Sequence, residues 1–307
     1  MSCHHPLKAF EGISGRMIFS DSPKKVICGP DGSPKVYYLP CGKCLGCRLD
    51  YAKDWSLRCV MESRLHKQNS FVTLTYNEEN LPQEGVLKKH VQDFFKRLRF
   101  RLAESSGAPV RISYLACGEY GTRTFRAHYH AIIFGWCPDD LKYFFTDSKS
   151  GCKVYKSSFL DDVWKHGFTT VGEDVSYECC NYVARYVIKK QLQEEENAQF
   201  FAERNKSFIL SSRRPAIGLE SLQRLGRQIV FQDEIVIPGR LTSKPPRYFD
   251  KKLKERYPYE WLEVLEKRKK AMQEAYPDEE SMRKQLAIKE VYLKQRTQSI
   301  MKGNGNV

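Results

Sequence analysis

Two histidines separated by one residue stand out, because they fall in an apolar run with the alternation of a β-strand. His128 and His130 lie in AHYHAIIFG. Side chains two positions apart on a strand point to the same face, so the two imidazoles are expected to converge while Tyr129 points to the opposite face. Paired imidazoles are common metal ligands. The sequence therefore predicts a metal site on one face of this strand and packing on the other.

A carboxylate is available from the segment just before the histidines. Glu119 lies near the end of RISYLACGEYG, which alternates as a strand, and the following GTRTFRA has the composition of a turn. Two strands joined in this way are antiparallel neighbours. We therefore expect Glu119 beside the histidines as the third ligand.

A second group of chemically useful residues lies in NYVARYVIKK, which has helical apolar spacing and lacks Gly and Pro. Tyr182 and Tyr186 are four residues apart, so they lie one above the other on a helix, and Lys189 falls on the same stripe. A phenol with a pKa of about 10 is a weak nucleophile, but a metal that polarises a phosphate lowers the barrier to its attack. The lysine would offset phosphorane charge or help to remove the phenolic proton.

Taken together, these residues resemble the HUH endonucleases, the tyrosine nickases that start rolling-circle DNA replication. Three motifs occur in the family's order: the strand FVTLTY, then His128-Tyr129-His130 with Glu119 upstream, then YVARYVIK. The aromatic Tyr129 is a mild departure from the family pattern. The YVARYV run, the early PCGKCLGCR and the chain length are similar to the replication initiators of microviruses, particularly the gokushovirus branch. The resemblance covers residues 41–190.

The resemblance implies a site-specific endonuclease and ligase that initiates rolling-circle replication of a small circular single-stranded phage genome. His128, His130 and Glu119 would hold Mg²⁺ or Mn²⁺ at the scissile phosphate of single-stranded or locally melted viral origin DNA. Attack by Tyr182 or Tyr186 would leave a free 3′-OH and a 5′-phosphotyrosyl link. The second tyrosine would then allow the circle to be closed without ATP.

Three other interpretations compete with this one. Two imidazoles and a carboxylate also bind iron in oxygenases, but nothing else here requires a redox metal, and the tyrosines would have no role. A single-tyrosine HUH transposase would need only one phenol. A non-catalytic, zinc-stabilised single-strand binder would need only the positive charge, the aromatic residues and the cysteines.

The composition favours a polyanionic partner. The 307 residues carry a net charge of +14, and 12% are aromatic, which supplies surfaces for unpaired bases. No GxxxxGK[ST] phosphate loop occurs, so strand separation is expected to depend on a host helicase, and extension on a host DNA polymerase. The chain start MSCHHPLKAF does not resemble a signal peptide, and no stretch is apolar enough to span a membrane. We therefore expect the cytoplasm of the bacterial host and no membrane partner.

Three of the eleven cysteines are regularly spaced in CGKCLGC. Cys41, Cys44 and Cys47 could supply three ligands of a tetrahedral structural zinc ion, which needs a fourth. The candidates for that fourth ligand are Cys3, His4, His5, Cys28 and Cys59, and we favour Cys3. Free thiols and an iron–sulfur cluster are the alternatives.

The order of expected elements is strand, helix, strand, strand, helix, strand, helix. This order predicts an α+β fold in which helices pack on a central antiparallel sheet, related to the split βαβ arrangement. We expect a cysteine-rich N-terminal cap over residues 1–66, a nickase core over 67–195 and a basic C-terminal region over 196–307. The cap is expected to be irregular, and the C-terminal region to hold short strands and then two charged helices that separate near Tyr276-Pro277.

Overall fold

A computed structural model describes residues 2–20, 23–121, 124–148, 151–172, 175, 179–180, 198–237 and 242–303, with side chains as far as 296. The chain divides into two compact units. One unit is Ala52–Val264, and the other joins the residues up to Tyr51 with those from Leu265 onwards. The three-part division expected from the sequence stays a prediction.

The larger unit is built on an antiparallel sheet. Within the described residues this sheet has seven strands, and its neighbours all run antiparallel. In spatial order the strands are β10 (Phe208–Ser211), β5 (Ser113–Tyr120), β6 (Ala127–Phe134), β4 (Asn69–Tyr76), β9 (Gly167–Gly172), β8 (Lys153–Lys156) and β7 (Lys142–Thr146). The predicted α+β class with a large antiparallel sheet is confirmed.

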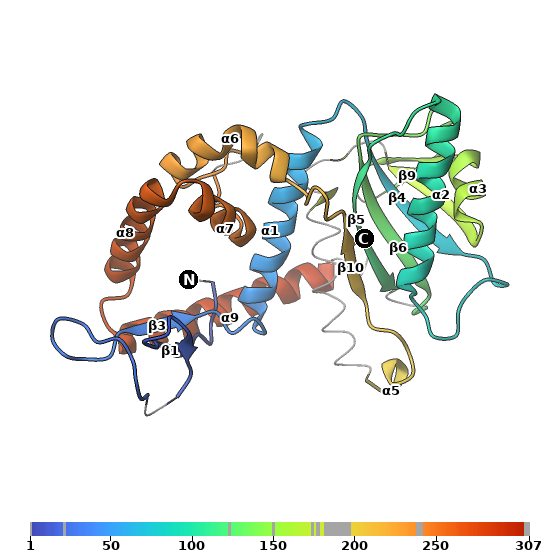
Figure 1. The fold of residues 1–307 in the computed structure, drawn as a ribbon. Helices are drawn as coiled ribbons and strands as arrows, with labels where there is room; N and C mark the ends of the chain where they lie inside the picture. Colours follow the sequence, from blue (N-terminus) through green and yellow to red (C-terminus); the bar gives the residue numbers. More distant parts are fainter. Residues whose placement is uncertain are drawn as a thin grey trace. The chain divides into compact units, whose positions relative to one another are not determined.

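Two helices, α2 (Lys88–Ser106) and α3 (Ser158–Trp164), pack against one face of this sheet (Figure 1). Helix α2 buries a helically spaced apolar stripe that was expected from the sequence, and it contacts the alternate residues of β4 and β6. Arg97, expected on the solvated face of α2, instead donates to the carbonyls of Val163 and Trp164 at 2.8 and 3.0 Å. This guanidinium therefore ties the end of α3 to α2.

The opposite face of the sheet is covered at one end by the last turns of α1 (Leu45–Ser63). Cys59 and Val60 of α1 pack there with residues of β5 and β6 and with Ile217. At the other end of the same face, β4, β5 and β6 present polar side chains. The sheet therefore separates a wholly apolar layer from a face that is apolar at one end and polar at the other.

A third group of helices has its own apolar core within the larger unit. Helix α6 (Leu219–Gln232), helix α7 (Arg247–Arg256) and the start of α8 (Pro258–Ala275) pack around Phe249, Leu253 and Trp261. The expectation of a β-like piece at IVFQ was wrong, because Ile229 and Val230 fall with Leu222 on one helical face of α6. The short helix α5 (Ala198–Phe201) precedes β10.

The smaller unit contains strands β1 (Leu7–Glu11), β2 (Met17–Ile18) and β3 (Val36–Leu39), which form an antiparallel sheet in the order β2-β1-β3. The expectation of an irregular cap was therefore wrong in this respect. Helix α9 (Glu279–Gly303) packs on it through Met282 and Leu286 with Tyr38. The helices do separate at 276–278, but the basic C-terminal region has three of them among its described residues from 247 onwards, not two.

Other boundaries differ from expectation for local reasons. Helix α1 was expected from Arg48 but begins at Leu45, so Cys47 lies in its first turn. Helix α3 ends at Lys165, which takes the left-handed conformation expected for Gly167. The β7–β8 hairpin was not predicted, because KYFFT is exposed at every position and shows no alternation. No helix in the described ranges combines the length and the apolar character needed to cross a membrane.

The α2 layer gives a direct test of this packing. Phe94 is fully buried, so Phe94→Ala should lower the free energy of unfolding by about 3–5 kcal/mol, because apolar packing is removed and a cavity is left. Phe100, on the same helix and 68% exposed, is the matched control, and its substitution by Ala should change that free energy by less than about 0.5 kcal/mol. Urea unfolding measures both. Equal effects would contradict the assignment of the buried face.

Candidate active site and cysteine cluster

The polar end of the sheet brings three potential metal ligands together. Glu119 of β5 is the direct cross-strand partner of His128 of β6. One carboxylate oxygen, Oε1, lies 2.7 Å from Nε2 of His128 and 3.0 Å from Nε2 of His130. Ligand atoms bound at about 2.1 Å and at right angles to each other lie about 3 Å apart. The spacing of the three side chains therefore fits a single divalent ion.

The two faces of β6 divide as the alternation of its residues requires. His128 and His130 face the polar end, whereas Tyr129, Ala131 and Ile133 belong to the apolar layer under α2. The hydroxyl of Tyr129 is fixed within that layer, because it lies 2.6 Å from the Tyr76 hydroxyl and accepts from the Leu87 amide at 2.7 Å. The strand that carries the imidazoles is thus anchored from behind.

Each imidazole is oriented by a contact at its other nitrogen. Nδ1 of His128 lies 3.0 Å from the carbonyl oxygen of Arg126, and Nδ1 of His130 lies 2.9 Å from the Thr73 hydroxyl. Since a carbonyl only accepts, Nδ1 of His128 must carry the proton, and in the neutral ring Nε2 then presents its lone pair. Both Nε2 atoms face the same carboxylate oxygen. Such second contacts fix the orientation of metal-binding histidines in proteins.

The carboxylate itself is charged although it is buried. Glu119 is 1% exposed. Burial raises the pKa of its carboxyl, but the charge of His130 and the hydrogen bond with His128 outweigh burial and lower that pKa to about 2. A buried carboxylate needs a cation beside it, since an uncompensated buried charge is strongly unfavourable. Protons on the imidazoles or a bound metal ion can meet this need.

The same face carries an aromatic side chain that the sequence did not single out. Phe168 of β9 pairs with Thr75 of β4, and Thr75 pairs with His128. Phe168 therefore lies in the cross-strand row of His128, about 10 Å away at two strand spacings. Its ring is 58% exposed. Nothing in FTTVG marks this residue, because its position depends on pairing between strands that are distant in the sequence.

The expected nucleophiles belong to another part of the chain. Tyr182, Tyr186 and Lys189 lie outside the residues that the structure describes. Their role, like the roles of His128, His130 and Glu119 as ligands, stays a prediction.

The N-terminal cysteines form a second cluster, in the smaller unit. The sulfurs of Cys3, Cys41, Cys44 and Cys47 all lie within 4.8 Å of one another. The Cys41–Cys47 and Cys44–Cys3 sulfur distances are 4.0 and 3.9 Å. Four sulfurs bound to zinc at about 2.3 Å in a tetrahedron lie about 3.8 Å apart. The structure thus brings Cys3 to the position expected for the fourth ligand.

Comparisons with known proteins agree with this arrangement. The model of the replication-associated protein ORF2 family matches residues 69–191. The replication-associated protein VP4 of Bdellovibrio phage phiMH2K is 31% identical over 266 residues, which are 86% of this chain and 80% of that protein. Replication-associated protein ORF2 of Spiroplasma virus 4 is 34% identical, over 76% of this chain and 73% of that protein. The chain belongs to this family of phage replication-associated proteins. The resemblance to microvirus replication initiators is confirmed.

A third relative is matched over less of its length. Replication-associated protein ORF4 of Chlamydia phage 1 is 32% identical over 216 residues, which are 69% of this chain and 52% of that protein. No solved structure matches the chain. The family match over residues 69–191 includes Glu119, His128 and His130 as well as the tyrosine segment, but it does not reach the cysteine cluster.

The cysteines of this replication-associated protein differ in acidity. Burial raises the pKa of the Cys41 thiol, but the backbone N–H groups of Cys44 and Lys43 outweigh burial and lower that pKa to about 7. Burial raises the pKa of Cys3 and of Cys47. Backbone amides also donate to two other sulfurs: Cys41 to Cys3 at 3.2 Å and His4 to Cys44 at 3.4 Å. The loop is therefore built to hold thiolate charge.

This difference predicts the order of alkylation in the metal-free protein. At pH 7 roughly half of Cys41 should be thiolate, so iodoacetamide should modify it before Cys3 and Cys47. Peptide mass spectrometry measures the order, and the exposed Cys28 reports the general reactivity of the reagent. Faster modification of Cys3 or Cys47 would contradict the assigned acidities.

Proposed function

We propose that this replication-associated protein is a metal-dependent tyrosine endonuclease that nicks and rejoins single-stranded origin DNA to initiate rolling-circle replication of a small phage genome. One observation carries the proposal: Glu119 Oε1 lies within 3.0 Å of Nε2 of both His128 and His130, on one sheet face. Membership of a phage replication family supports the choice of DNA as the substrate. The same site on a protein of unrelated family would leave the substrate open.

His128, His130 and Glu119 would hold Mn²⁺ or Mg²⁺. Two imidazole nitrogens and one carboxylate oxygen suit Mn²⁺ better than Mg²⁺, which prefers oxygen ligands. When bound, the ion polarises the scissile phosphate and neutralises charge that develops on its oxygens. Arg126 and Thr73 act indirectly, because they hold the imidazoles with Nε2 toward the carboxylate. Phe168, exposed in the row of His128, offers a ring on which an unpaired base next to that phosphate can stack.

The proposed nucleophiles are Tyr182 and Tyr186. The oxygen of one phenol bonds to phosphorus as the bond to the departing 3′-oxygen breaks, which gives a 5′-phosphotyrosyl ester and a free 3′-OH. Lys189 takes the phenolic proton or offsets the charge on phosphorus. The ester keeps the energy of the broken bond, so a second transfer, to the other tyrosine, releases the new 3′-OH that closes the circle.

The cysteine cluster is proposed to hold a structural zinc ion through Cys3, Cys41, Cys44 and Cys47. Sulfur distances of 3.9 and 4.0 Å and the amide hydrogen bonds to the sulfurs support zinc over free thiols. Added Zn²⁺ should then suppress the alkylation of Cys41. The protein would act in the cytoplasm of the bacterial host, on viral origin DNA, with a host helicase and a host DNA polymerase.

The nucleophile assignment is tested by Tyr182→Phe and Tyr186→Phe, separately and together. With circular single-stranded DNA and Mn²⁺, the wild-type protein should form an adduct that survives SDS, because the phosphotyrosyl ester is covalent. Each single variant should keep nicking and lose rejoining, and the double variant should form no adduct on an SDS gel. Adduct formation by the double variant would disprove the assignment. An equal loss in only one single variant would favour a single-tyrosine enzyme.

The metal site is tested by His128→Ala. We expect cleavage of an origin oligonucleotide to fall by about 100-fold or more, equivalent to roughly 3 kcal/mol in the barrier, because a ligand is removed. His166→Ala is the matched control, since its ring contacts Tyr76 and Trp164 in the apolar layer behind the sheet. Strong binding without cleavage in the wild-type protein, under any divalent ion, would instead favour the non-catalytic binder.

A further inference from the structure

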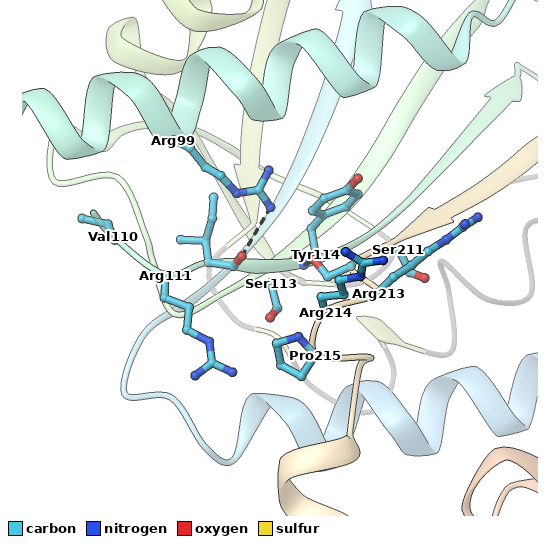
Figure 2. Close-up of a pocket in the computed structure, with 11 residues that line it drawn as sticks. Arg99, Val110, Arg111, Ser113, Tyr114, Ser211, Arg213, Arg214 and Pro215 are labelled. Carbon is cyan, nitrogen blue, oxygen red and sulfur yellow. Dashed lines mark hydrogen bonds between the residues drawn. The ribbon is translucent and has the colours of Figure 1, made fainter. Parts of the chain in front are cut away.

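A pocket of about 580 Å³ opens where β5 begins and β10 ends. Its walls come from α2, from the segment that leads into β5, and from the segment that follows β10, and Figure 2 shows Arg99 reaching toward it from the helix. All of these residues belong to the larger unit. The volume falls within the range of ordinary ligand sites.

The charge of the pocket is strongly positive. Four of its lining residues are arginines, and none of the described lining residues is acidic; the arginines are Arg99, Arg111, Arg213 and Arg214. Arg111 lies 3.7 Å from Glu220, which also pairs with Arg224, so its charge is only partly offset. Arg213 and Arg214 form no ion pair with a carboxylate of the described residues. Guanidinium groups gathered in this way repel one another unless an anion lies between them.

One arginine is held in place by aromatic rings. The Arg99 guanidinium lies 5.6 Å from the ring centre of Tyr114 and 6.0 Å from that of Phe95, and it donates to the carbonyl of Ile112 at 3.4 Å. The two rings stack on each other with centres 3.7 Å apart. A guanidinium with few remaining rotamers loses little entropy when it binds an anion.

Small polar groups complete the wall. Ser113, Ser211 and Ser212 line the pocket, and the Ser212 hydroxyl accepts from the Tyr114 amide at 3.0 Å. This hydrogen bond joins the end of β10 to the start of β5, so the segment that bears Arg213 and Arg214 is anchored at its first residue. Arginine forks with serine hydroxyls are typical of phosphate recognition.

The pocket is separate from the proposed nicking site. Ser113 and Glu119 are six residues apart on β5, which corresponds to about 20 Å along a strand. A stacked strand of about six nucleotides, at about 3.4 Å each, covers that length. One DNA strand can therefore reach both places.

We propose that this arginine pocket binds the phosphodiester backbone of single-stranded DNA about six nucleotides from the nicked bond. The proposal rests on the proposed function for its choice of ligand and of strand. A phosphate can accept paired hydrogen bonds from guanidinium forks without contact to a base, so the pocket would bind any sequence. It would hold the DNA in position while the nicking site acts.

The test compares two triple variants that remove the same charge. Arg111→Gln, Arg213→Gln and Arg214→Gln, all exposed, empty the pocket of three cations. Arg227→Gln, Lys251→Gln and Lys254→Gln remove three exposed cations elsewhere in the same unit. Binding of the full chain to fluorescein-labelled (dT)30 is followed by anisotropy between 50 and 300 mM salt, with EDTA present so that no cleavage occurs.

Each phosphate interaction that is removed should lower the slope of log affinity against log salt by about 0.7 in magnitude. The slope of the pocket triple variant should therefore fall by about 1.4 to 2.1 if two or three such interactions are broken, and that of the control triple variant by less than about 0.7. Equal decreases in the two variants, or no decrease in the pocket variant, would overturn the proposal. Thermal melting confirms folding, and the single variant Arg214→Gln, with an expected decrease of about 0.7, replaces the triple variant if that one unfolds.

A second arm separates this proposal from the nicking function. An eight-nucleotide substrate centred on the scissile bond is too short to reach the pocket, so its cleavage with Mn²⁺ should be the same in the wild-type protein and the pocket variant. Cleavage of a 30-nucleotide origin strand at low DNA concentration should fall in the pocket variant alone. Loss of cleavage on the short substrate would show that the substitutions damage the nicking site, which overturns a separate pocket. A wild-type protein that cleaves neither substrate would contradict the nickase, while the salt slopes still decide the pocket.

Discussion

The register between β5 and β6 is the constraint on which the site depends. Glu119 faces His128 directly, so the carboxylate and both imidazoles share one face. Side chains alternate along a strand, and a slip of one residue would send Glu119 into the apolar layer under α2. That slip is opposed from behind, because the Tyr129 hydroxyl bonds Tyr76 and the Leu87 amide. The apolar face of the sheet thereby fixes the geometry of its polar face.

Burial then gives this geometry its chemistry. A carboxylate that is 1% exposed cannot be stabilised by water, so it stays charged only because two imidazoles turn their Nε2 atoms toward it. Thr73 and the carbonyl of Arg126 hold the rings in that orientation. The site is therefore preorganised for a cation before any ligand arrives, and an ion entering it meets little cost of reorganisation.

The parts of this molecule that follow local rules could be predicted from the sequence. The alternation in AHYHAIIFG places His128 and His130 on one face, and the apolar stripe of α2 gives its buried residues. What escaped prediction depends on contacts between distant segments. Phe168 joins the row of His128 only through β4, and Arg213 and Arg214 meet Arg99 only because β10 pairs with β5. Cys3 was one of five candidates, and no spacing rule could have decided between them. The tyrosine segment stays a prediction, since it lies outside the described residues.

A rigid strand links the two ends of the larger unit. Strand β5 carries Glu119 near one end and Ser113 and Tyr114, which line the arginine pocket, at the other, and it is paired along both edges. A strand bonded on both sides cannot lengthen or slide without breaking its ladders, so the distance between the two places is set by the backbone. A DNA strand held at the pocket would therefore present a fixed nucleotide to the metal-binding face, and that spacing needs no base contact. In this arrangement, position along the strand is measured by the sheet, while recognition of the sequence is left to groups near the nicked bond such as Phe168.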